Sequence, residues 1–214
     1  MVCVRPLYFN EQLSFPCGKC IACRIQRTQE WSTRIIHETS EHKHSAFVTL
    51  TYNDESLPQN MSLKKSDLQK FFKRLRRDIP IKYYACGEYG DLLRPHYHAI
   101  IFGLAVNQTK LIEENWPFGH VMLGTATTES ARYVAGYIQK KLYGKLAYTD
   151  KENAFQIQSQ GIGLAWASKH QEQIQENQTI TVQGVPMGIP RYYIKKLGLD
   201  LSEASLKLDE KSEE

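Results

Sequence analysis

The chain has 214 residues, of which 42% are hydrophobic, 11% aromatic and 23% charged. These values are ordinary for a soluble globular protein and exclude fibrous and wholly disordered classes. The length fits one main domain with small appendages, at roughly 100–200 residues per domain. The longest apolar stretch, Ala99–Val106, is far shorter than the ~18–20 residues that span a bilayer, and the first residues carry no apolar leader. We therefore expect a cytoplasmic protein with no membrane partner.

Charge is distributed unevenly along the chain. Lys and Arg number 27 against 23 Asp and Glu, which gives a net charge of +4. Residues 200–214 hold six acidic residues and only two lysines, so the remainder of the chain is more basic than this mean. A basic body with an acidic tail permits a nucleic-acid partner without requiring one.

The five cysteines suggest a metal rather than disulfides. Cys17, Cys20 and Cys23 are each separated by two residues, Cys3 precedes them, and Cys86 stands alone. An odd count with this spacing, and without a secretion signal, argues against a disulfide scaffold. Cys3 would complete four thiolate ligands for a structural zinc ion. An iron–sulfur cluster and plain reduced thiols remain alternatives, and Cys86, in an apolar run, is expected in the core.

The segment after the cysteines predicts a helix, a strand and a second helix. Residues 24–41 contain no Gly or Pro, and residues 46–52 (AFVTLTY) alternate as a strand does. Ser66 and Gln69 match a capping box, which predicts that the second helix begins at Ser66 and ends before Pro80.

This second helix is predicted to be amphipathic. Its apolar positions recur at helical spacing: Leu68, Phe71, Phe72, Leu75 and Ile79. Its other face is basic, with Lys64, Lys65, Lys70, Lys73, Arg74, Arg76 and Arg77. We expect Lys73, Arg74 and Arg77 to contact DNA, although such a face can also be merely solvated.

The next segments complete an α+β pattern. Residues 81–90 and 96–103 predict two strands that pair antiparallel across a short connection. Residues 110–116 predict a short helix, 120–123 a short strand, and 130–143 a helix closed by a glycine. This order predicts a central antiparallel sheet of the ferredoxin-like type, with helices packed on one face and an N-terminal cysteine-rich metal-binding arm.

The pattern divides the chain into four parts. We expect a cysteine-rich arm and helix over residues 1–41, a sheet-containing core over 42–147, an accessory segment over 148–199 and an acidic tail over 200–214. The architecture of the accessory segment does not follow from its sequence pattern.

A pair of histidines on a predicted strand is the clearest chemical signal. Because side chains alternate along a strand, His96 and His98 lie on the same face of the sheet. Glu88 precedes His96 by eight residues, which places its carboxylate near the same rung across the hairpin. Two nitrogens and one oxygen suit a divalent catalytic ion such as Mg²⁺ or Mn²⁺. His120 and His170 stand alone in the sequence and are left out of this site.

Two tyrosines on the last predicted helix are candidate nucleophiles. Tyr133 and Tyr137 are four residues apart and share one helix face, which Lys140 borders. A phenol is a poor nucleophile at its ordinary pKa, and a neighbouring ammonium and a metal would supply the missing activation. The alternative is an amphipathic helix whose tyrosines only pack.

The motifs together resemble a known superfamily. AFVTLTY, EYGDLLRPHYHAIIFG and ARYVAGYIQKK are similar, in order and spacing, to the three motifs of HUH endonucleases, in which U is a hydrophobic residue. More narrowly, CGKCIACR near the start and GIGLAW and IPRYYIKKLG near the end resemble the replication initiators of microviruses, gokushoviruses in particular. The resemblance extends from Cys3 to about Gly198.

The resemblance implies rolling-circle initiation at a metal-assisted tyrosine. A tyrosine would attack a phosphodiester of single-stranded or origin DNA, giving a 5′-phosphotyrosyl link and a 3′-OH that primes the host polymerase. His96 and His98 match the metal-binding pair, and Glu88 best matches the third ligand.

The resemblance also ranks the two tyrosines. Tyr137 with Lys140 matches the Tyr-x-x-Lys form and is the first choice of nucleophile, and Tyr133 matches the second tyrosine of two-tyrosine initiators. Gly136 stands where a doubled motif would place a second lysine, and Lys141 is expected to hold a phosphate.

Alternatives to a phage initiator are an HUH transposase or relaxase, and a non-catalytic zinc-containing nucleic-acid-binding protein. The chain has no Walker-type Gly-rich loop, so unwinding would need a host helicase in the bacterial cytoplasm.

Overall fold

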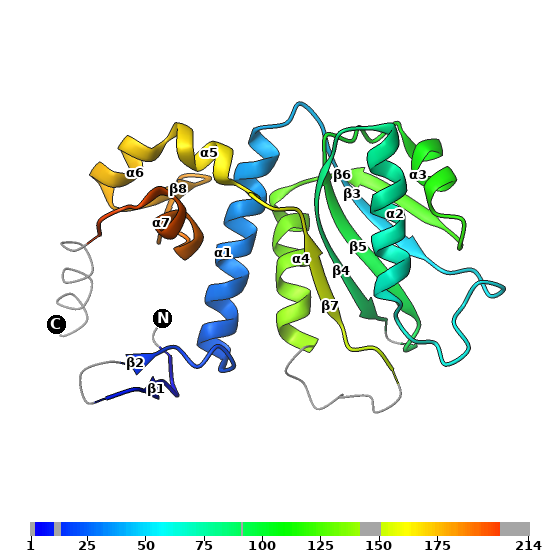
Figure 1. Ribbon diagram of the computed structural model, residues 1–214, viewed down its shortest axis with the longest axis horizontal. Coiled ribbons are helices and arrows are strands. Elements are labelled where there is room, and N and C mark those ends of the chain that lie inside the picture. Colours follow the sequence, from blue (N-terminus) through cyan, green and yellow to red (C-terminus); the bar gives the residue numbers. More distant parts are fainter. Residues whose placement is uncertain (1–2, 11–13, 91, 142–150, 202–214) are drawn as a thin grey trace.

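The computed structural model describes residues 3–10, 14–90, 92–141 and 151–201, without the side chains of 137–141. Figure 1 shows a twisted sheet flanked by helices, with the N-terminal ribbon and a C-terminal lobe gathered around one long helix, α1 (Ile21–Ser40). Within the described residues, no helix combines the length and apolarity that crossing a membrane requires.

The central sheet has five antiparallel strands in the order β6-β3-β5-β4-β7. Its strands are β3 (Ser45–Thr51), β4 (Lys82–Tyr89), β5 (Pro95–Phe102), β6 (Val121–Thr125) and β7 (Phe155–Gln158). The first four confirm the predicted strands and the antiparallel pairing of β4 with β5. β7 was not predicted, because its four residues FQIQ are too few to show a strand period.

One face of the sheet is covered by α2 (Lys65–Asp78) and by α3 (Thr109–Asn115), which follows β5. The predicted apolar stripe of α2 packs here, with Phe71 and Leu75 fully buried against strand residues such as Val48 and Ile101. Trp116 closes the layer next to α3 and donates its indole N–H to the carbonyl of Thr51. This side is the larger apolar core.

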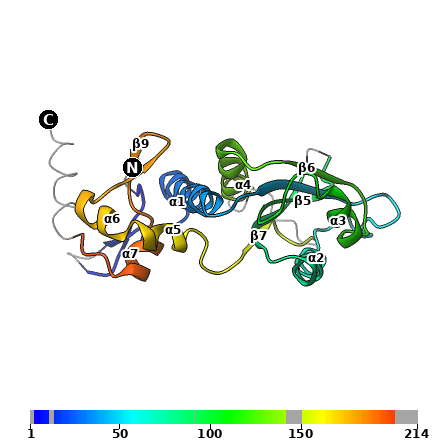
Figure 2. The same cartoon turned by 90° about the horizontal axis from the view of Figure 1, so that it is seen from above.

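The opposite face is covered by α1 and α4 (Thr128–Lys141). Ile35 of α1 and Val134 of α4 pack on Tyr84 and Ile100 from the sheet. The prediction that helices occupy one face is therefore wrong, and Figure 2 shows α4 and α2 on opposite sides of the strands. The central strands carry apolar side chains on both faces, as in the neighbours Ile100 and Ile101, so each face requires its own cover.

The start of α2 also differs from the prediction. The helix is capped at Lys64, without a side-chain hydrogen bond, and Ser66 lies inside the first turn. Tertiary partners fix this start, because Lys64 N–H donates to the Tyr97 hydroxyl and Lys65 N–H donates to the Glu152 carboxylate. Two long-range acceptors replace the local cap.

The two ends of the chain form small units beside the sheet. The N-terminal ribbon pairs β1 (Leu7–Tyr8) with β2 (Ser14–Phe15). The C-terminal lobe contains α5 (Leu164–Lys169), α6 (Gln171–Asn177), β8 (Ile180–Val182), β9 (Val185–Met187) and α7 (Arg191–Leu197).

The lobe rests on the buried side of α1. The ring of His37 stacks on Trp166 at 3.4 Å between centroids, and its Nδ1 lies 3.0 Å from the Tyr193 hydroxyl. The Arg34 side chain lies between the rings of Trp31 and Tyr192. These contacts give the predicted accessory segment its place in the fold.

Candidate active site

Strand pairing assembles the predicted metal-binding set. In the β4–β5 register Glu88 faces His96, and Cys86 faces His98. Glu88 Oε1 lies 2.8 Å from His96 Nε2 and 3.1 Å from His98 Nε2. One ligand atom from each residue lies within 4.8 Å of the others. The predicted trio therefore converges on one point of the sheet, on the face that α4 covers.

The outer nitrogens of both imidazoles are held in place. His96 Nδ1 lies 3.2 Å from the Arg94 carbonyl oxygen, and His98 Nδ1 lies 3.0 Å from Thr49 Oγ1. A carbonyl only accepts, so His96 carries its proton on Nδ1 and turns the lone pair of Nε2 towards Glu88 when the ring is neutral. Hydrogen bonds of this kind orient the histidine ligands of metal sites.

Burial makes a cation the natural complement of this trio. The Glu88 side chain is 1% exposed, and within the described residues its Oε2 and His98 Nε2 make no hydrogen bond. Burial would raise the pKa of Glu88, but the contacts with His96 and His98 outweigh it and hold that pKa below its ordinary value. A buried carboxylate facing two nitrogen lone pairs fits a divalent ion.

The α4 helix brings Tyr133 to this trio. Its ring lies 5.3 Å from that of His98 and 6.3 Å from that of Phe47, edge-on in both cases, and the residue is 44% exposed. Thr127 and Ser130 exchange hydrogen bonds between side chain and backbone at the start of α4, which fixes where the helix begins. Tyr133 is therefore placed between the sheet and solvent.

The other predicted residues of α4 are placed only by their backbone. Tyr137 and Lys140 belong to α4, one and nearly two turns after Tyr133, and Lys141 is its last residue. The side chains of all three lie outside the described residues, so their predicted roles stay predictions.

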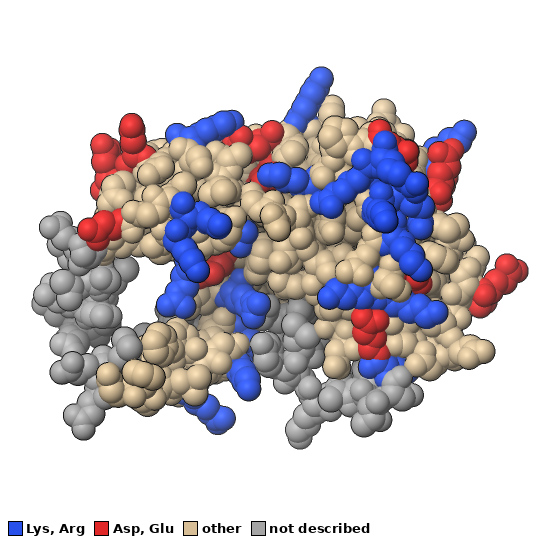
Figure 3. All heavy atoms as spheres, in the orientation of Figure 1, with Lys and Arg blue, Asp and Glu red and all other residues tan. Residues whose placement is uncertain are grey.

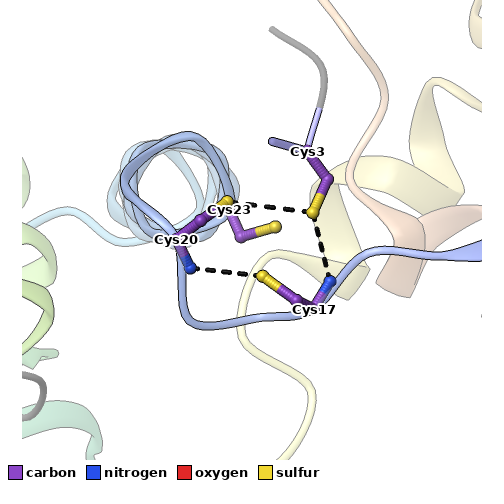
Figure 4. Close-up of side chains that lie close together, drawn as sticks. All are labelled: Cys3, Cys17, Cys20 and Cys23. Atoms are coloured by element: carbon purple, nitrogen blue, oxygen red, sulfur yellow. Dashed lines mark hydrogen bonds between the residues drawn. The ribbon is translucent and has the colours of Figure 1, made fainter. Parts of the chain in front are cut away.

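The second predicted metal-binding set is also assembled. The four thiols of Cys3, Cys17, Cys20 and Cys23 point towards a common centre (Figure 4), and their sulfurs lie within 4.8 Å of one another. Cys3 Sγ and Cys20 Sγ are 3.8 Å apart. Zn–S bonds of about 2.3 Å in a tetrahedron place two sulfurs at roughly this separation.

Backbone amides surround the sulfurs of this cluster. The N–H groups of Lys19 and Cys20 donate to Cys17 Sγ at 3.4 and 3.3 Å, and Cys17 N–H donates to Cys3 Sγ at 3.3 Å. Hydrogen bonds from the Cys23 and Val4 backbones lower the pKa of Cys20 to about 6. The thiolate is the form that binds metals. Cys86, by contrast, is fully buried in the sheet, as predicted.

Comparison with known proteins identifies the family. Residues 45–142 match the family model described as replication-associated protein ORF2. The chain is 31% identical to replication-associated protein VP4 of Bdellovibrio phage phiMH2K, over 90% of this chain and 76% of that protein. The chain belongs to the microvirus replication-associated proteins. The matched segment contains Glu88, His96, His98 and Tyr133.

Two further microvirus replication-associated proteins are similar. Identity is 33% to protein ORF2 of Spiroplasma virus 4, over 86% of this chain and 66% of that protein. It is 29% to protein ORF4 of Chlamydia phage 1, over 91% of this chain and 57% of that protein. The chain thus spans about three fifths to three quarters of the length of these relatives. No solved structure matches this replication-associated chain.

The predicted DNA-contacting residues of α2 lie away from the trio. Lys73, Arg74 and Arg77 are on the helix that covers the opposite face of the sheet, where basic side chains gather in Figure 3. Arg74 donates to the carbonyl of Asn115, at 2.7 Å from Nη2, and so ties α2 to the end of α3. Lys73 and Arg77 are exposed.

The structure adds His120, which the sequence analysis left out. His120 precedes β6, its carbonyl accepts the N–H of Thr51, and its side chain lines a cleft that His96 also lines. The sequence gives no local signal for this neighbourhood, because His120 is 24 residues after His96 and the two meet through pairing of β6 and β5 with β3.

Proposed function

We propose that this chain initiates rolling-circle replication of a phage genome by nicking single-stranded origin DNA with a tyrosine of α4. The carrying observation is the position of Tyr133, edge-on to His98, beside a buried set of two histidines and one carboxylate. The family supports a role in DNA replication. The nuclease chemistry is the function that a phenol next to such a set supports best.

The proposed step conserves the number of phosphoester bonds. The tyrosine oxygen bonds to phosphorus while the bond from phosphorus to the 3′ oxygen breaks. The phenol loses its proton, and the 3′ oxygen gains one to become a hydroxyl. The products are a 5′-phosphotyrosyl link and a 3′-OH that can prime the host polymerase. Attack by that hydroxyl reverses the step and reseals the strand, so no nucleotide cofactor is needed.

Residues of the sheet would hold the ion and the tyrosines would supply the nucleophiles. Glu88, His96 and His98 would bind Mn²⁺ or Mg²⁺, which would stabilise charge on a phosphate oxygen. Tyr133 and Tyr137, four residues apart, offer one phenol for nicking and one for the later transfer, and Lys140 would favour the phenolate of Tyr137.

The four cysteines of the arm would bind a structural zinc ion. The sulfur separation of 3.8 Å and the amides donating to Cys17 support a closed tetrathiolate site. Such a site would hold the ribbon of β1 and β2 against the start of α1. Its donors are all sulfur, whereas the sheet trio offers nitrogen and oxygen, so the two sets favour different ions.

The substrate would be single-stranded. A base-paired strand cannot readily bring one phosphate down to side chains on a sheet, whereas a free strand can bend. Lys73, Arg77 and Lys141 would contact the DNA backbone beyond the cut, with Lys141 nearest the tyrosines. Unwinding would come from a host helicase, in the cytoplasm of the bacterial host.

A covalent adduct tests this proposal. The protein is incubated with Mn²⁺ and labelled circular single-stranded DNA of its phage genome, and protein-linked label is followed on a denaturing gel. We expect an adduct from the wild type and none from the double variant Tyr133→Phe, Tyr137→Phe. Tyr8→Phe, on the exposed ribbon, is the matched control and should react normally.

The single variants rank the tyrosines. Loss of the adduct in Tyr137→Phe alone would support Tyr137 as the first nucleophile, and loss in Tyr133→Phe alone would support Tyr133. Tight DNA binding by the wild type without any adduct, with Mn²⁺ or Mg²⁺, would overturn the nuclease proposal and leave a binding protein.

A further inference from the structure

A cleft opens beside His96, at the end of the sheet where β3 ends and the β4–β5 hairpin turns. Its volume is about 490 Å³, within the roughly 300–1,000 Å³ of small-molecule sites. Three segments line it: the end of β3 with the following loop (Thr51, Tyr52, Asn53, Asp54), the hairpin (Gly90, Leu92, Arg94, Pro95, His96) and His120 before β6. His96 thus belongs both to this cleft and to the buried trio.

The walls of the cleft are tied together. Arg94 donates to the Tyr52 carbonyl at 2.8 Å and pairs with the Asp54 carboxylate at 2.8 Å, which joins the hairpin to the loop after β3. The hairpin itself is closed by the Gly90 and Leu93 amides, which donate to the carbonyls of Arg94 and Gly90. A cleft held by such contacts is largely formed before a ligand enters.

The lining favours a neutral aromatic ligand over a second phosphate. Among the described lining residues, the one guanidinium and the one carboxylate are paired with each other. Leu92 is 89% exposed at the mouth and, with Pro95, offers apolar surface. The exposed His120 ring adds a second surface for stacking, and Asn53 adds an amide for hydrogen bonding.

We propose that this cleft binds one nucleobase of the single-stranded DNA, from the nucleotide next to the phosphate at Glu88, His96 and His98. The proposal rests on the proposed nicking function, because a phosphate beside His96 brings a base of the same strand within reach. Leu92 and His120 form the sides against which the base stacks, and Asn53 reads its edge. The cleft therefore sets which base stands beside the cut.

Nicking of a randomised library tests this assignment. Single-stranded oligonucleotides randomised across the cut are reacted with Mn²⁺, and the protein-linked products are sequenced. We expect a base preference at one position adjoining the cut, and loss of that preference alone in Leu92→Ser and His120→Ala. Met122→Ser and His44→Ala are matched controls outside the cleft, at an exposed methionine and an exposed histidine.

A binding measurement separates this proposal from the nuclease chemistry. The Tyr133→Phe, Tyr137→Phe variant, with Mn²⁺, is titrated with fluorescent oligonucleotides in which each position in turn is abasic. Loss of the base in the cleft should weaken binding about tenfold, because stacking of one base contributes on this order. Adding Leu92→Ser or His120→Ala should abolish that difference.

The outcomes are distinct. If the wild type forms no adduct, the nuclease proposal fails, while the abasic titration still decides the cleft. Equal binding of every abasic strand, or an unchanged base preference in both cleft variants, would overturn the nucleobase site.

Discussion

The two clusters of potential metal ligands are built in opposite ways. Three of the four cysteines lie within seven residues, at the start of α1, and only Cys3 comes from elsewhere in the arm. The trio on the sheet comes from two paired strands and is enclosed by further residues: Thr49 from β3, Phe47 and Tyr133. The first cluster is a local motif on an exposed arm, and the second is a product of the sheet.

This difference indicates what each cluster depends on. The thiols need an ion to hold them together, because β1 and β2 form a ribbon of two residue pairs whose apolar side chains are mostly exposed. The trio is held by strand hydrogen bonds and by side-chain contacts that exist without an ion. Metal should therefore fold the arm but only complete the sheet site.

Cys20→Ser should give the largest change, confined to the arm. Structural zinc contributes about 10–16 kcal/mol of binding free energy in zinc-finger peptides, so one missing thiolate should remove nearly all bound zinc. Zinc released per chain and the melting of the sheet core are measured together. Cys86→Ala, in the buried sheet, should keep the zinc. Zinc retained by Cys20→Ser would break the proposed contrast between the clusters.

His98→Ala should act on chemistry rather than on arm structure. We expect adduct formation to fall by about 10²–10³-fold, the usual cost of removing one group that stabilises charge in a transition state. The zinc content of the arm should not change. His44→Ala removes an exposed histidine just before β3 and serves as the control. Normal adduct formation by His98→Ala would show that the trio is structural.

A third buried histidine distinguishes burial from ligation. His37 has no carboxylate partner in the described contacts, and burial, helped by His170, lowers its pKa to about 4. The unfolded chain, with a pKa near 6.5, then binds the proton more readily, so this stability is present above about pH 6.5 and is lost as the pH falls towards 4.

Between pH 7 and pH 5 the loss from His37 should be about 2 kcal/mol. Urea unfolding at both pH values measures it, and His37→Gln should show that much less pH dependence than the wild type. An equal slope for the two proteins would contradict a neutral, buried His37.

Thr49→Val should have the smallest effect of the four. The substitution removes the hydroxyl 3.0 Å from His98 Nδ1 and leaves the ligands in place. We expect Mn²⁺ affinity to fall about tenfold, at the lower end of the 10–100-fold cost of losing such a contact. Calorimetric titration with Mn²⁺ measures it. Thr51→Val, two residues along the same strand, is the control, and equal affinities of the two variants would argue against this role of Thr49.

The sequence by itself determined the features that depend on short spacing. Strand alternation placed His96 and His98 on one face, a hairpin of eight residues placed Glu88 beside them, and the tight cysteine spacing predicted a sulfur site. The order of strands and helices in the core also followed from hydrophobic period. These inferences need only the geometry of one strand, one turn or one helix.

Only the tertiary structure decided which of these pieces meet. Tyr133 reaches His98 because α4 packs on the same face as the trio, and α2, with its basic residues, covers the other face. The start of α2 at Lys64 depends on Tyr97 and Glu152. His120 joins His96 through strands that pair with β3. Each of these contacts joins segments far apart in the chain, where packing of whole elements, rather than local period, fixes the neighbours.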